Sequence, residues 1–469
     1  MKRHYLAIDI GASSGRHILS WLEDGKIQME EIYRFENGMK KKDGHLCWDV
    51  EKLFAEIVNG MKKCKEMNKV PVSMGIDTWG VDFALLDVNG ELLGDVIGYR
   101  DHRTEGMDAK VYEYIDANAL YERTGIQKQI FNTIYQLMAV KEQTPEYMEK
   151  AEALLLMPDY FNYRLTGKKE TEYTNATTMQ LINPKTQNWD TELIELLGYK
   201  KSMFTPIRMA GTSVGRLTKE IQDIVGYDVE VLHATSHDTA AAVLAVPAKN
   251  DDFLYISSGT WSLMGVEQTE ANCSEEARKA NLTNEGGYEY RYRFLKNIMG
   301  LWMIQSVRHE LEDKYSFAEL CEMADKCNDF SSRVDVNADV FLAPENMTEA
   351  IRQYCKKTGQ EVPESVGELA TVIYQSLAKS YGETIKEIEG ITGRTYDAIH
   401  IVGGGSNAAY LNQLTANATG KTVYSGPSEA TALGNILVQM IKMQEFEGTN
   451  EARNAVFESF AVQTYQPNK

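Results

Sequence analysis

One pattern occurs twice in this chain: an apolar strand, a turn rich in glycine and serine, and a second apolar strand. The first copy covers residues 5–21 (YLAIDIGASSGRHILSW) and the second covers residues 253–265 (FLYISSGTWSLMG). Glycine lets the backbone turn tightly and leaves N–H groups bare, and serine adds hydroxyl donors. The two copies lie much too far apart for a solenoid repeat. The pattern therefore predicts two similar domains, each of which opens with a hairpin.

The first turn carries the groups that bind a chain of phosphates. Arg16 adds a fork of N–H donors to the bare N–H groups of the turn at 11–16. Asp9 stands at the carboxyl end of the strand, where it would supply an oxygen ligand to Mg²⁺, directly or through water. From this segment alone, a polar hairpin turn that binds nothing is an equally good interpretation.

A third glycine-rich element follows late in the chain. Residues 399–407 (IHIVGGGSN) run from a strand through three glycines into a helix, a turn that lets the backbone approach a nucleotide closely. Each of the three signals is weak when taken alone. Their order and spacing favour an α/β protein with two actin-like ATPase domains around a central cleft.

Strands and helices alternate along the chain, as in layered α/β proteins. We expect strands at 27–35 and 72–76, mainly helices over 105–200, and further helices at 50–68, 366–391 and 407–418. Residues 246–252 (VPAKNDD) form a polar break between an apolar helix and the second hairpin. The sequence therefore predicts two domains, residues 1–247 and residues 248–469.

Composition excludes several classes of protein. The net charge of −19 argues against nucleic acid or an anionic membrane as a partner. No apolar run approaches the length of a membrane span, and Asp9 interrupts the apolar core that a signal peptide needs. The six cysteines are scattered and match no zinc spacing, so we expect reduced thiols in a cytoplasmic protein.

The segment 233–239 (HATSHDT) precedes an apolar run at 240–246 that predicts a buried helix. Asp238 would then stand at the start of this helix, where a capping role is the simplest interpretation. A cap needs only one polar group, however, and His237 and Thr239 flank Asp238. This favours Asp238 as a general base, because a hydroxyl attacks a γ-phosphoryl group poorly unless its proton is accepted.

Two other segments resemble known motifs, a P-loop and a zinc-binding helix, but neither matches its motif fully. Residues 419–422 (TGKT) end like a P-loop, but the first glycine of that motif would fall on Thr415, and the segment runs from helix to strand. We interpret Gly420 as a helix C-cap instead. His233 and His237 are spaced for zinc on one helix face, but no glutamate follows His233 as the zinc motif requires.

On these residues the chain resembles the FGGY carbohydrate kinases over essentially its whole length. The segments that carry the resemblance include IDIGASSGR (8–16), IDTWGVDF (76–83), YRDHRT (99–104), SHDTAAAV (236–243), SSGTWSLMG (257–265), IVGGGSN (401–407) and GPSEATALGN (426–435). The resemblance implies two ribonuclease H-like domains, an N-terminal one that binds sugar and a C-terminal one that binds nucleotide. It also implies an enzyme that uses ATP and Mg²⁺ to convert L-rhamnulose to L-rhamnulose 1-phosphate. We expect a monomer or a homodimer. The tetrapeptide FGGY itself is absent, and we interpret the EGGY at 285–288 as coincidence.

The resemblance also implies roles for individual residues. It places the phosphates of ATP against Ala12, Ser13, Ser14, Gly15 and Arg16, and other parts of the nucleotide against Thr260, Gln305 and Gly404. It places the sugar against Gly80, His237, Asp238, Thr239 and Asn297, with Asp238 as the proton acceptor.

Two alternatives remain open at this point. A sister kinase for L-fuculose or a pentulose is the nearer one, because a single hydroxyl or methyl group changes specificity only modestly. The other is an ATP-driven binding protein of the same fold, whose output is domain closure rather than phosphoryl transfer.

Overall fold

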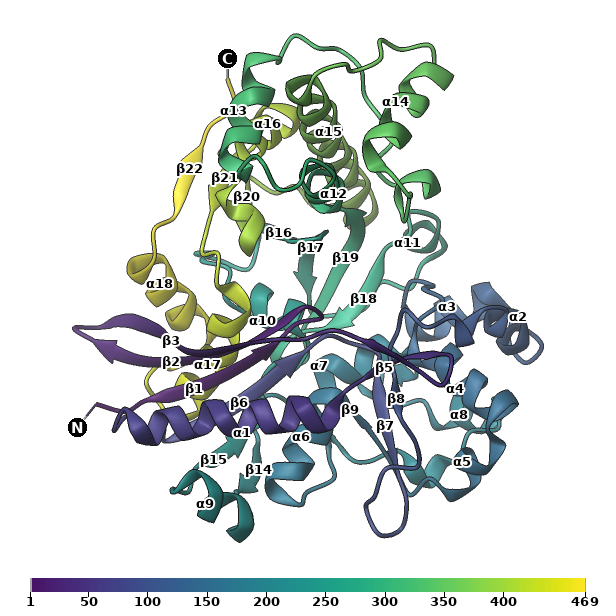
Figure 1. The fold of residues 1–469 in the computed structure, drawn as a ribbon, viewed down its shortest axis with the longest axis vertical. Helices are drawn as coiled ribbons and strands as arrows, with labels where there is room; N and C mark the ends of the chain where they lie inside the picture. Colours follow the sequence, from purple (N-terminus) through teal and green to yellow (C-terminus); the bar gives the residue numbers. More distant parts are fainter. Residues whose placement is uncertain (1, 469) are drawn as a thin grey trace. The chain divides into compact units, whose positions relative to one another are not determined.

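The computed structural model describes residues 2–468 (Figure 1). Contacts between Cα atoms divide the chain into two compact units. The first unit contains Met1–Ala245, Glu267–Phe294 and Thr431–Ser459, and the second contains Val246–Val266, Leu295–Ala430 and Phe460–Lys469. Two segments from the second half of the chain thus belong to the first unit. The single boundary at 247/248 therefore stays a prediction.

The first unit is built on a six-stranded sheet with the order β14-β15-β6-β1-β2-β3. Its strands are β1 (Tyr5–Ile10), β2 (Ser14–Glu23), β3 (Lys26–Glu36), β6 (Ser73–Thr78), β14 (Ser213–Arg216) and β15 (Glu230–Leu232). Strand β1 forms the predicted antiparallel hairpin with β2 and pairs in parallel with β6. Every residue of β1 and β6 is buried, as expected for central strands with both faces covered.

Helices cover this sheet and close its core. Helix α1 (Val50–Glu66) begins after Asp49, whose side chain caps it, and it buries Leu53, Ile57 and Met61 in the same apolar cluster as Ile8 of β1. The other helices of this layer are α6 (Met157–Thr166), α9 (Lys219–Val225), α10 (Asp238–Leu244), α17 (Ala430–Lys442) and α18 (Thr449–Ser459), whereas α11 (Glu275–Lys279) belongs to the same unit but contacts the helix at Ala117–Thr124.

A second apolar cluster of the first unit forms around strands β7 (Phe83–Leu86) and β9 (Ala153–Leu156), which pair antiparallel. The helices of this part are α2 (Met107–Tyr112), α3 (Ala117–Thr124), α4 (Thr133–Gln143), α5 (Pro145–Lys150), α7 (Tyr173–Ala176) and α8 (Thr191–Leu196). Its short strands are β10 (Thr171–Glu172), β11 (Ile182–Asn183), β12 (Asn188–Trp189) and β13 (Ile207–Arg208). Strands β4 (Lys40–Lys42), β5 (His45–Trp48) and β8 (Val96–Ile97) form a separate three-stranded sheet, which packs Trp48 and Val96 into the first cluster. The region 105–200 is thus largely helical, as the sequence predicts, with short strands between its helices.

The seven-stranded sheet has the order β18-β19-β17-β16-β20-β21-β22. Its strands are β16 (Leu254–Ser258), β17 (Trp261–Gln268), β18 (Thr283–Gly286), β19 (Tyr292–Met299), β20 (Ala398–Val402), β21 (Thr422–Ser425) and β22 (Gln463–Tyr465). Strand β16 forms a hairpin with β17 and pairs in parallel with β20, which pairs in parallel with β21. The hairpin β1-β2 followed by parallel β6 and β15 has the same plan, so the predicted duplication of the fold is confirmed.

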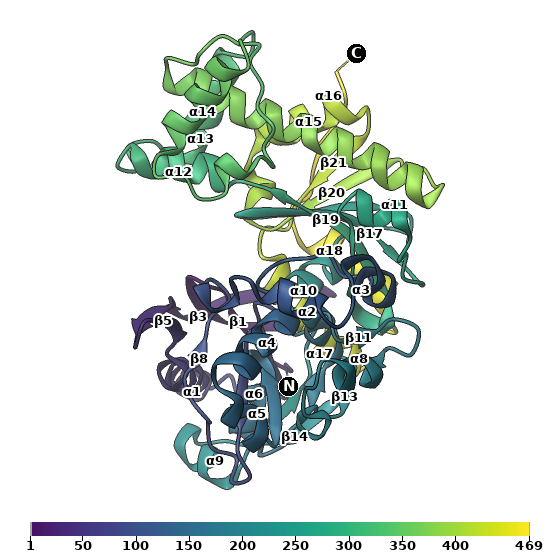
Figure 2. The same cartoon turned by 90° about the vertical axis from the view of Figure 1, so that its right-hand side faces the viewer.

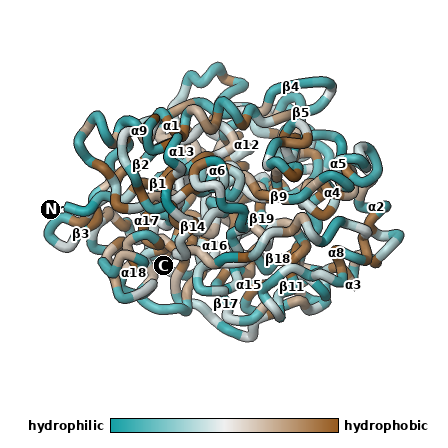
Figure 3. The backbone as a smooth tube through the Cα atoms, turned by 90° about the horizontal axis from the view of Figure 1, so that it is seen from below, coloured by the Kyte–Doolittle hydropathy of each residue, from teal (hydrophilic) through white to brown (hydrophobic). Residues whose placement is uncertain are grey.

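The helices of the second unit are α12 (Trp302–Glu310), α13 (Phe317–Lys326), α14 (Met347–Lys357), α15 (Val366–Thr392) and α16 (Ala409–Thr419). Figure 2 shows α15 and α16 near strands β20 and β21. Helix α16 begins two residues later than predicted, because residues Gly404–Asn407 first form a 3-10 turn. The chain colours in Figure 3 mix hydrophilic and hydrophobic segments, and among residues 2–468 no helix is long and apolar enough to cross a membrane.

Candidate active site

The turn between β1 and β2 is a tight loop closed by its own backbone. Gly11 donates its N–H to the carbonyl of Ser14 at 2.9 Å, and the side chain of Asn37 donates to the carbonyl of Gly11 at 2.8 Å. Ala12 and Ser13 lie in this turn, whereas Ser14, Gly15 and Arg16 already belong to β2. A Cβ atom on Gly15 would lie 2.0 Å from the ring of Phe35, so only glycine fits there.

Two carboxylates lie side by side at the end of the hairpin strand. Asp9 of β1 is in register with Asp77 of β6, and Arg16 forms an ion pair with Asp9 at 2.6 Å. The Oδ2 atom of Asp77 accepts a hydrogen bond from Asn435 at 2.6 Å, but its buried Oδ1 atom has no partner within the described chain. Burial and then the charge of Asp9 raise the pKa of Asp77 well above its usual value. The sequence reasoning missed Asp77, although its strand ends in an acid just as β1 does.

These acids fit a magnesium ion better than a metal held by protein alone. Within residues 2–468, no group of three or more His, Cys, Asp or Glu side chains is arranged to hold a metal. Mg²⁺ usually takes one or two carboxylates and completes its shell with water and phosphate oxygens. The unpartnered oxygen of Asp77 beside Asp9 is suited to such a site.

Asp238 is the first residue of α10, and its contacts are not those of a helix cap. A capping side chain accepts from an N–H two or three residues further on. The Oδ1 atom of Asp238 instead accepts from the N–H of Thr239 at 2.6 Å and from its hydroxyl at 3.1 Å. Burial and then the charge of Asp9 raise the pKa of Asp238 to about 6. The carboxylate is therefore ionised at neutral pH and basic enough to take a proton.

His237 lies directly before Asp238 and contacts a buried ion pair. Its Nδ1 atom is 2.9 Å from Nη2 of Arg293, and its Nε2 atom is 3.4 Å from Oδ1 of Asp238. Arg293 is completely buried, and its Nη2 atom is also 3.1 Å from Oε2 of Glu285. Burial and then the charge of Arg293 lower the pKa of His237 far below its usual value. No local motif pointed to Arg293, and Glu285 is the first residue of the EGGY tetrapeptide.

The loop with Gly80 has a strained backbone. Val81 has a φ of +67°, a left-handed conformation that β-branched residues rarely adopt. Its N–H donates to the hydroxyl of Thr178 at 3.1 Å, and its carbonyl accepts from the hydroxyl of Thr133 at 2.6 Å. Thr178 also limits the space at Gly80, where a Cβ atom would lie 3.0 Å from its Oγ1 atom. Such strain persists only where surrounding contacts enforce it, and it is most frequent at functional sites.

Asp82 anchors the end of this loop. Its Oδ2 atom accepts hydrogen bonds from the indoles of Trp48 at 2.6 Å and Trp79 at 2.9 Å, and from the N–H of Tyr99 at 3.1 Å. Burial raises the pKa of Asp82 to about 6. Trp79 is therefore a core residue that orients the loop.

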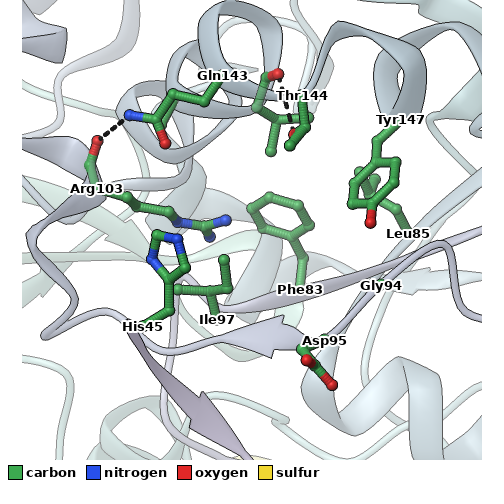
Figure 4. Close-up of a pocket in the computed structure, with 12 residues that line it drawn as sticks. His45, Phe83, Leu85, Gly94, Asp95, Ile97, Arg103, Gln143, Thr144 and Tyr147 are labelled. Carbon is green, nitrogen blue, oxygen red and sulfur yellow. Dashed lines mark hydrogen bonds between the residues drawn. The ribbon is translucent and has the colours of Figure 1, made fainter. Parts of the chain in front are cut away.

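A cavity of about 210 Å³ is lined by Phe83, the residue after Asp82, and by Arg103 (Figure 4). The guanidinium of Arg103 points into it beside Phe83 and donates to Oε1 of Gln136 at 2.6 Å. Gln136 in turn donates to Oδ1 of Asp82 at 3.0 Å, and Gln143 donates to the carbonyl of Arg103 at 3.1 Å. The segment 99–104 is thus linked to the loop at 76–83 by hydrogen bonds, through Gln136 and through the N–H of Tyr99.

The second unit gathers its own set of predicted residues. The hydroxyl of Thr260, in the turn between β16 and β17, donates to Oε1 of Gln305 on α12 at 3.3 Å. The turn that contains Gly404 packs against the end of β16, and a Cβ atom on Gly405 would lie 2.0 Å from the hydroxyl of Ser258. The structure thus brings together two of the three glycine-rich elements. Asn297 lies on β19 in the same unit, and its contact with sugar stays a prediction.

The segment 419–422, which ends like a P-loop in sequence, runs from a helix into a strand. Helix α16 ends at Thr419, and Gly420 follows as its C-cap with a φ of +67°. Strand β21 then begins at Thr422. The interpretation of Gly420 as a cap is confirmed.

Comparison with known proteins defines the class of this chain. The model of the N-terminal domain of the FGGY family of carbohydrate kinases matches residues 4–245, and that of the C-terminal domain matches residues 254–443. The chain belongs to the FGGY family of carbohydrate kinases. It is 50% identical to a rhamnulokinase of Halalkalibacterium halodurans over 98% of both chains, and 44% identical to a rhamnulokinase of Bacillus subtilis over 99% of this chain and 95% of that one.

Solved structures confirm the predicted fold class. A xylulose kinase from Lactobacillus acidophilus superposes with a TM-score of 0.81 at 16% identity, covering 99% of this chain and 94% of that one. A Plasmodium falciparum glycerol kinase with ADP superposes with a TM-score of 0.81 at 14% identity, covering 100% of this chain and 95% of that one. The two-domain α/β fold of sugar kinases is thus established for this chain.

Proposed function

We propose that this carbohydrate kinase transfers the γ-phosphoryl group of ATP to L-rhamnulose and forms L-rhamnulose 1-phosphate and ADP. The substrate follows from the rhamnulokinases that match nearly the whole chain at 42–50% identity. The structural observation that carries the chemistry is the carboxylate of Asp238, which has a pKa of about 6 and whose Oδ2 atom accepts no hydrogen bond from residues 2–468. An ATPase that only opens and closes needs no such base, so that alternative is not favoured.

In the proposed reaction, the 1-hydroxyl oxygen of the sugar attacks the γ-phosphorus as its proton passes to Oδ2 of Asp238. A new O–P bond forms, and the bond between the γ-phosphorus and the bridging oxygen breaks, so that ADP leaves with the electron pair. Because the protein forms no covalent bond to the substrates in this reaction, most of the rate acceleration comes from positioning the reactants and stabilising charge. The base contributes about 10²–10⁴-fold.

The predicted nucleotide contacts lie in glycine-rich turns and on helix α12. The predicted contacts in the first unit are Ala12, Ser13, Ser14, Gly15 and Arg16, and those in the second are Thr260, Gln305 and Gly404. Asp9 and Asp77 would hold Mg²⁺, which neutralises phosphate charge when it is bound. The support for this ion is the Oδ1 atom of Asp77, which has no partner within residues 2–468, and the position of Asp9 beside it in the strand register.

The sugar site combines backbone and polar side chains. We expect contacts from Gly80, His237, Thr239 and Asn297, in addition to Asp238. The strained backbone at Val81 and the bonds to Thr178 hold Gly80 in one position. A rigid loop of this kind discriminates between sugars. A sugar with a hydroxyl in the wrong position leaves polar groups of the protein unpaired, and this costs more binding free energy than the loss of a methyl contact.

A coupled assay of ADP release over a panel of sugars tests the substrate. L-Rhamnulose should give the highest kcat/KM, L-fuculose, L-ribulose and D-xylulose should fall behind by about tenfold or more, and glycerol should be inert. If one of the other ketoses gave a higher kcat/KM than L-rhamnulose, the assignment of the substrate would be wrong, whereas the assignment as a kinase would stand. Absence of ADP release with every sugar would overturn the kinase chemistry itself.

We further propose that the enzyme acts in the cytoplasm as a monomer or homodimer, without nucleic acid or membrane as a partner. The net charge of −19 supports the exclusion of polyanions. Light scattering coupled to gel filtration would report the oligomeric state directly.

A further inference from the structure

A buried arginine holds the imidazole next to the proposed base. Arg293 is completely buried on β19, and its Nη2 atom lies 2.9 Å from Nδ1 of His237 and 3.1 Å from Oε2 of Glu285. Its Nε atom donates to the carbonyl of Gly286 at 3.0 Å. Burying an arginine–glutamate pair gains little stability over apolar side chains of the same size. The pair therefore calls for another explanation.

The contact between Arg293 and His237 determines which imidazole nitrogen carries the proton. A guanidinium has only donors and keeps its charge at every physiological pH. The Nδ1 atom of His237 must therefore accept a hydrogen bond, which it does only when it carries no proton. A neutral imidazole then carries its proton on Nε2, and that atom lies 3.4 Å from Oδ1 of Asp238.

We infer that Arg293 and Glu285 form a positioning pair that fixes His237 as the neutral Nε2–H tautomer, so that its proton faces Oδ1 of Asp238 and Oδ2 remains the acceptor for the sugar proton. The inference rests on the proposed role of Asp238 as the base. It deepens that role because it assigns different work to the two oxygens of one carboxylate.

The contacts of Asp238 agree with this division of work. Its Oδ1 atom already accepts from the N–H and the hydroxyl of Thr239, and His237 lies on the same side. Within residues 2–468, no hydrogen bond reaches Oδ2. The two hydrogen bonds from Thr239, with the Nε2 atom of His237 3.4 Å from the same oxygen, would hold the carboxylate plane and leave the other oxygen open to the substrate.

The charges around His237 explain why an arginine is used. Glu285 is 3.5 Å from Nδ1 of His237 on one side, and Asp238 is on the other, with Asp9 and Asp77 beyond it. Between such acids an imidazole without Arg293 would be protonated. An imidazolium would form an ion pair with Asp238 and make it a poorer base. Arg293 neutralises Glu285 and keeps the imidazole neutral, and burial acts in the same direction.

Nitrogen NMR of the wild-type enzyme labelled with ¹⁵N-histidine tests the tautomer directly. His17 is an internal reference, because its Nε2 atom is 3.0 Å from the carbonyl of Ile57 and must donate. At neutral pH, His237, assigned by loss of its signals in His237→Gln, should show the same pattern as His17. A proton on Nδ1, or an imidazolium, would overturn the inference. This readout needs no turnover, so it stands or falls separately from the proposed kinase reaction.

Kinetics of Arg293→Met test the consequence for catalysis. We expect kcat to fall by about 10- to 100-fold, part of the contribution of a general base, with the KM for ATP changed by about twofold or less. The NMR pattern of His237 should change in the same variant, and Arg293→Lys, which keeps a donor, should restore part of both. An unchanged pattern in a folded Arg293→Met would contradict the inference.

Arg453→Met is the matched control for lost packing. Arg453 is also buried, forms an ion pair with Glu267 at 2.6 Å, and donates to the carbonyls of Val243 and Leu244 at the other end of α10. Its replacement should lower the apparent Tm but change kcat by about twofold or less and leave His237 unchanged. If both arginine variants reduced kcat equally, Arg293 would be only structural. If Arg293→Met does not fold, the spectra of the wild type and Arg293→Lys decide.

Discussion

Replacing Asp238 by asparagine should abolish most of the activity and keep the fold. The hydrogen bonds from Thr239 at 2.6 and 3.1 Å go to Oδ1, which asparagine retains. Oδ2 accepts none within the described residues, so an amide nitrogen there breaks nothing. The variant lacks only a proton acceptor, and we expect kcat to fall by about 10²–10⁴-fold.

The same replacement should stabilise the folded enzyme. Burial and the charge of Asp9 raise the pKa of Asp238 from 3.8 to about 6. A shift of about two units costs the ionised wild type about 3 kcal/mol well above pH 6. Because 35% of this side chain is exposed, solvent screening reduces the cost to about 1–2 kcal/mol. Asparagine carries no charge and avoids this cost.

The sign of the pH dependence follows from proton linkage. The pKa of Asp238 is higher in the folded state than in the unfolded state, so the folded state binds more protons between pH 3.8 and about 6. The wild type therefore loses stability from this group as the pH rises through that window. By the same linkage, the advantage of Asp238→Asn should be about twice as large at pH 8 as at pH 5.

Two assays check these expectations. Coupled release of ADP with L-rhamnulose and MgATP gives kcat, and thermal unfolding at the two pH values gives the apparent Tm. Asp223→Asn is the control, because Asp223 forms an exposed ion pair with Lys219 on α9. A variant of Asp238 that keeps more than about a third of kcat would refute its role as a base. One that is less stable than the wild type at pH 8 would refute the cost of burial.

Three further predictions follow from the same structure. In the wild type, kcat/KM should fall tenfold per pH unit below about pH 6, as Asp238 takes up a proton, and a pH–rate profile without this limb would contradict the assignment. Gly434→Ala should lower stability by about 1–3 kcal/mol in thermal unfolding, because its Cβ atom would lie 1.8 Å from the carbonyl oxygen of Ala241, and an unchanged Tm would show that α17 can shift. Val81→Gly should raise the KM for the ketose by up to about tenfold without lowering the Tm. Glycine adopts a φ of +67° without strain, and this offsets the extra cost of roughly 0.5–1 kcal/mol for ordering glycine, but the loop becomes less rigid. Steady-state kinetics with an unchanged KM would argue against a positioning role for the strain.

The parts of the fold that the sequence predicted are those with local signals. Apolar runs that break at glycine and serine predicted both hairpins. Helix periodicity predicted α1, α15 and α16 with bounds that agree with the structure within a few residues. The position of Asp238 at the start of α10 followed from the apolar run behind it.

The surroundings of Asp238 depended on distant parts of the chain and escaped prediction. Arg293 is 56 residues from His237, and nothing in its own segment indicates that it is buried. The sequence contained one signal for Asp77, since an acid is the penultimate residue of both β1 and β6, but only the strand register shows that Asp9 and Asp77 are neighbours. The roles of the predicted contact residues themselves stay predictions that the variants above address.

The return of α17 to the first unit has a consequence for the synthesis of this enzyme. Asn435 donates to Asp77 at 2.6 Å, and Gln439 donates to the carbonyl of Leu6 at 2.9 Å, so the first strand made is completed by a helix made near the end. Until α17 has been translated, the acceptor atoms on these central strands lack the donors that satisfy them in the folded protein. A nascent chain that stalls before residue 431 lacks the last segment of its first unit. Such a truncated chain cannot complete the fold of this unit, and we expect proteases to degrade it.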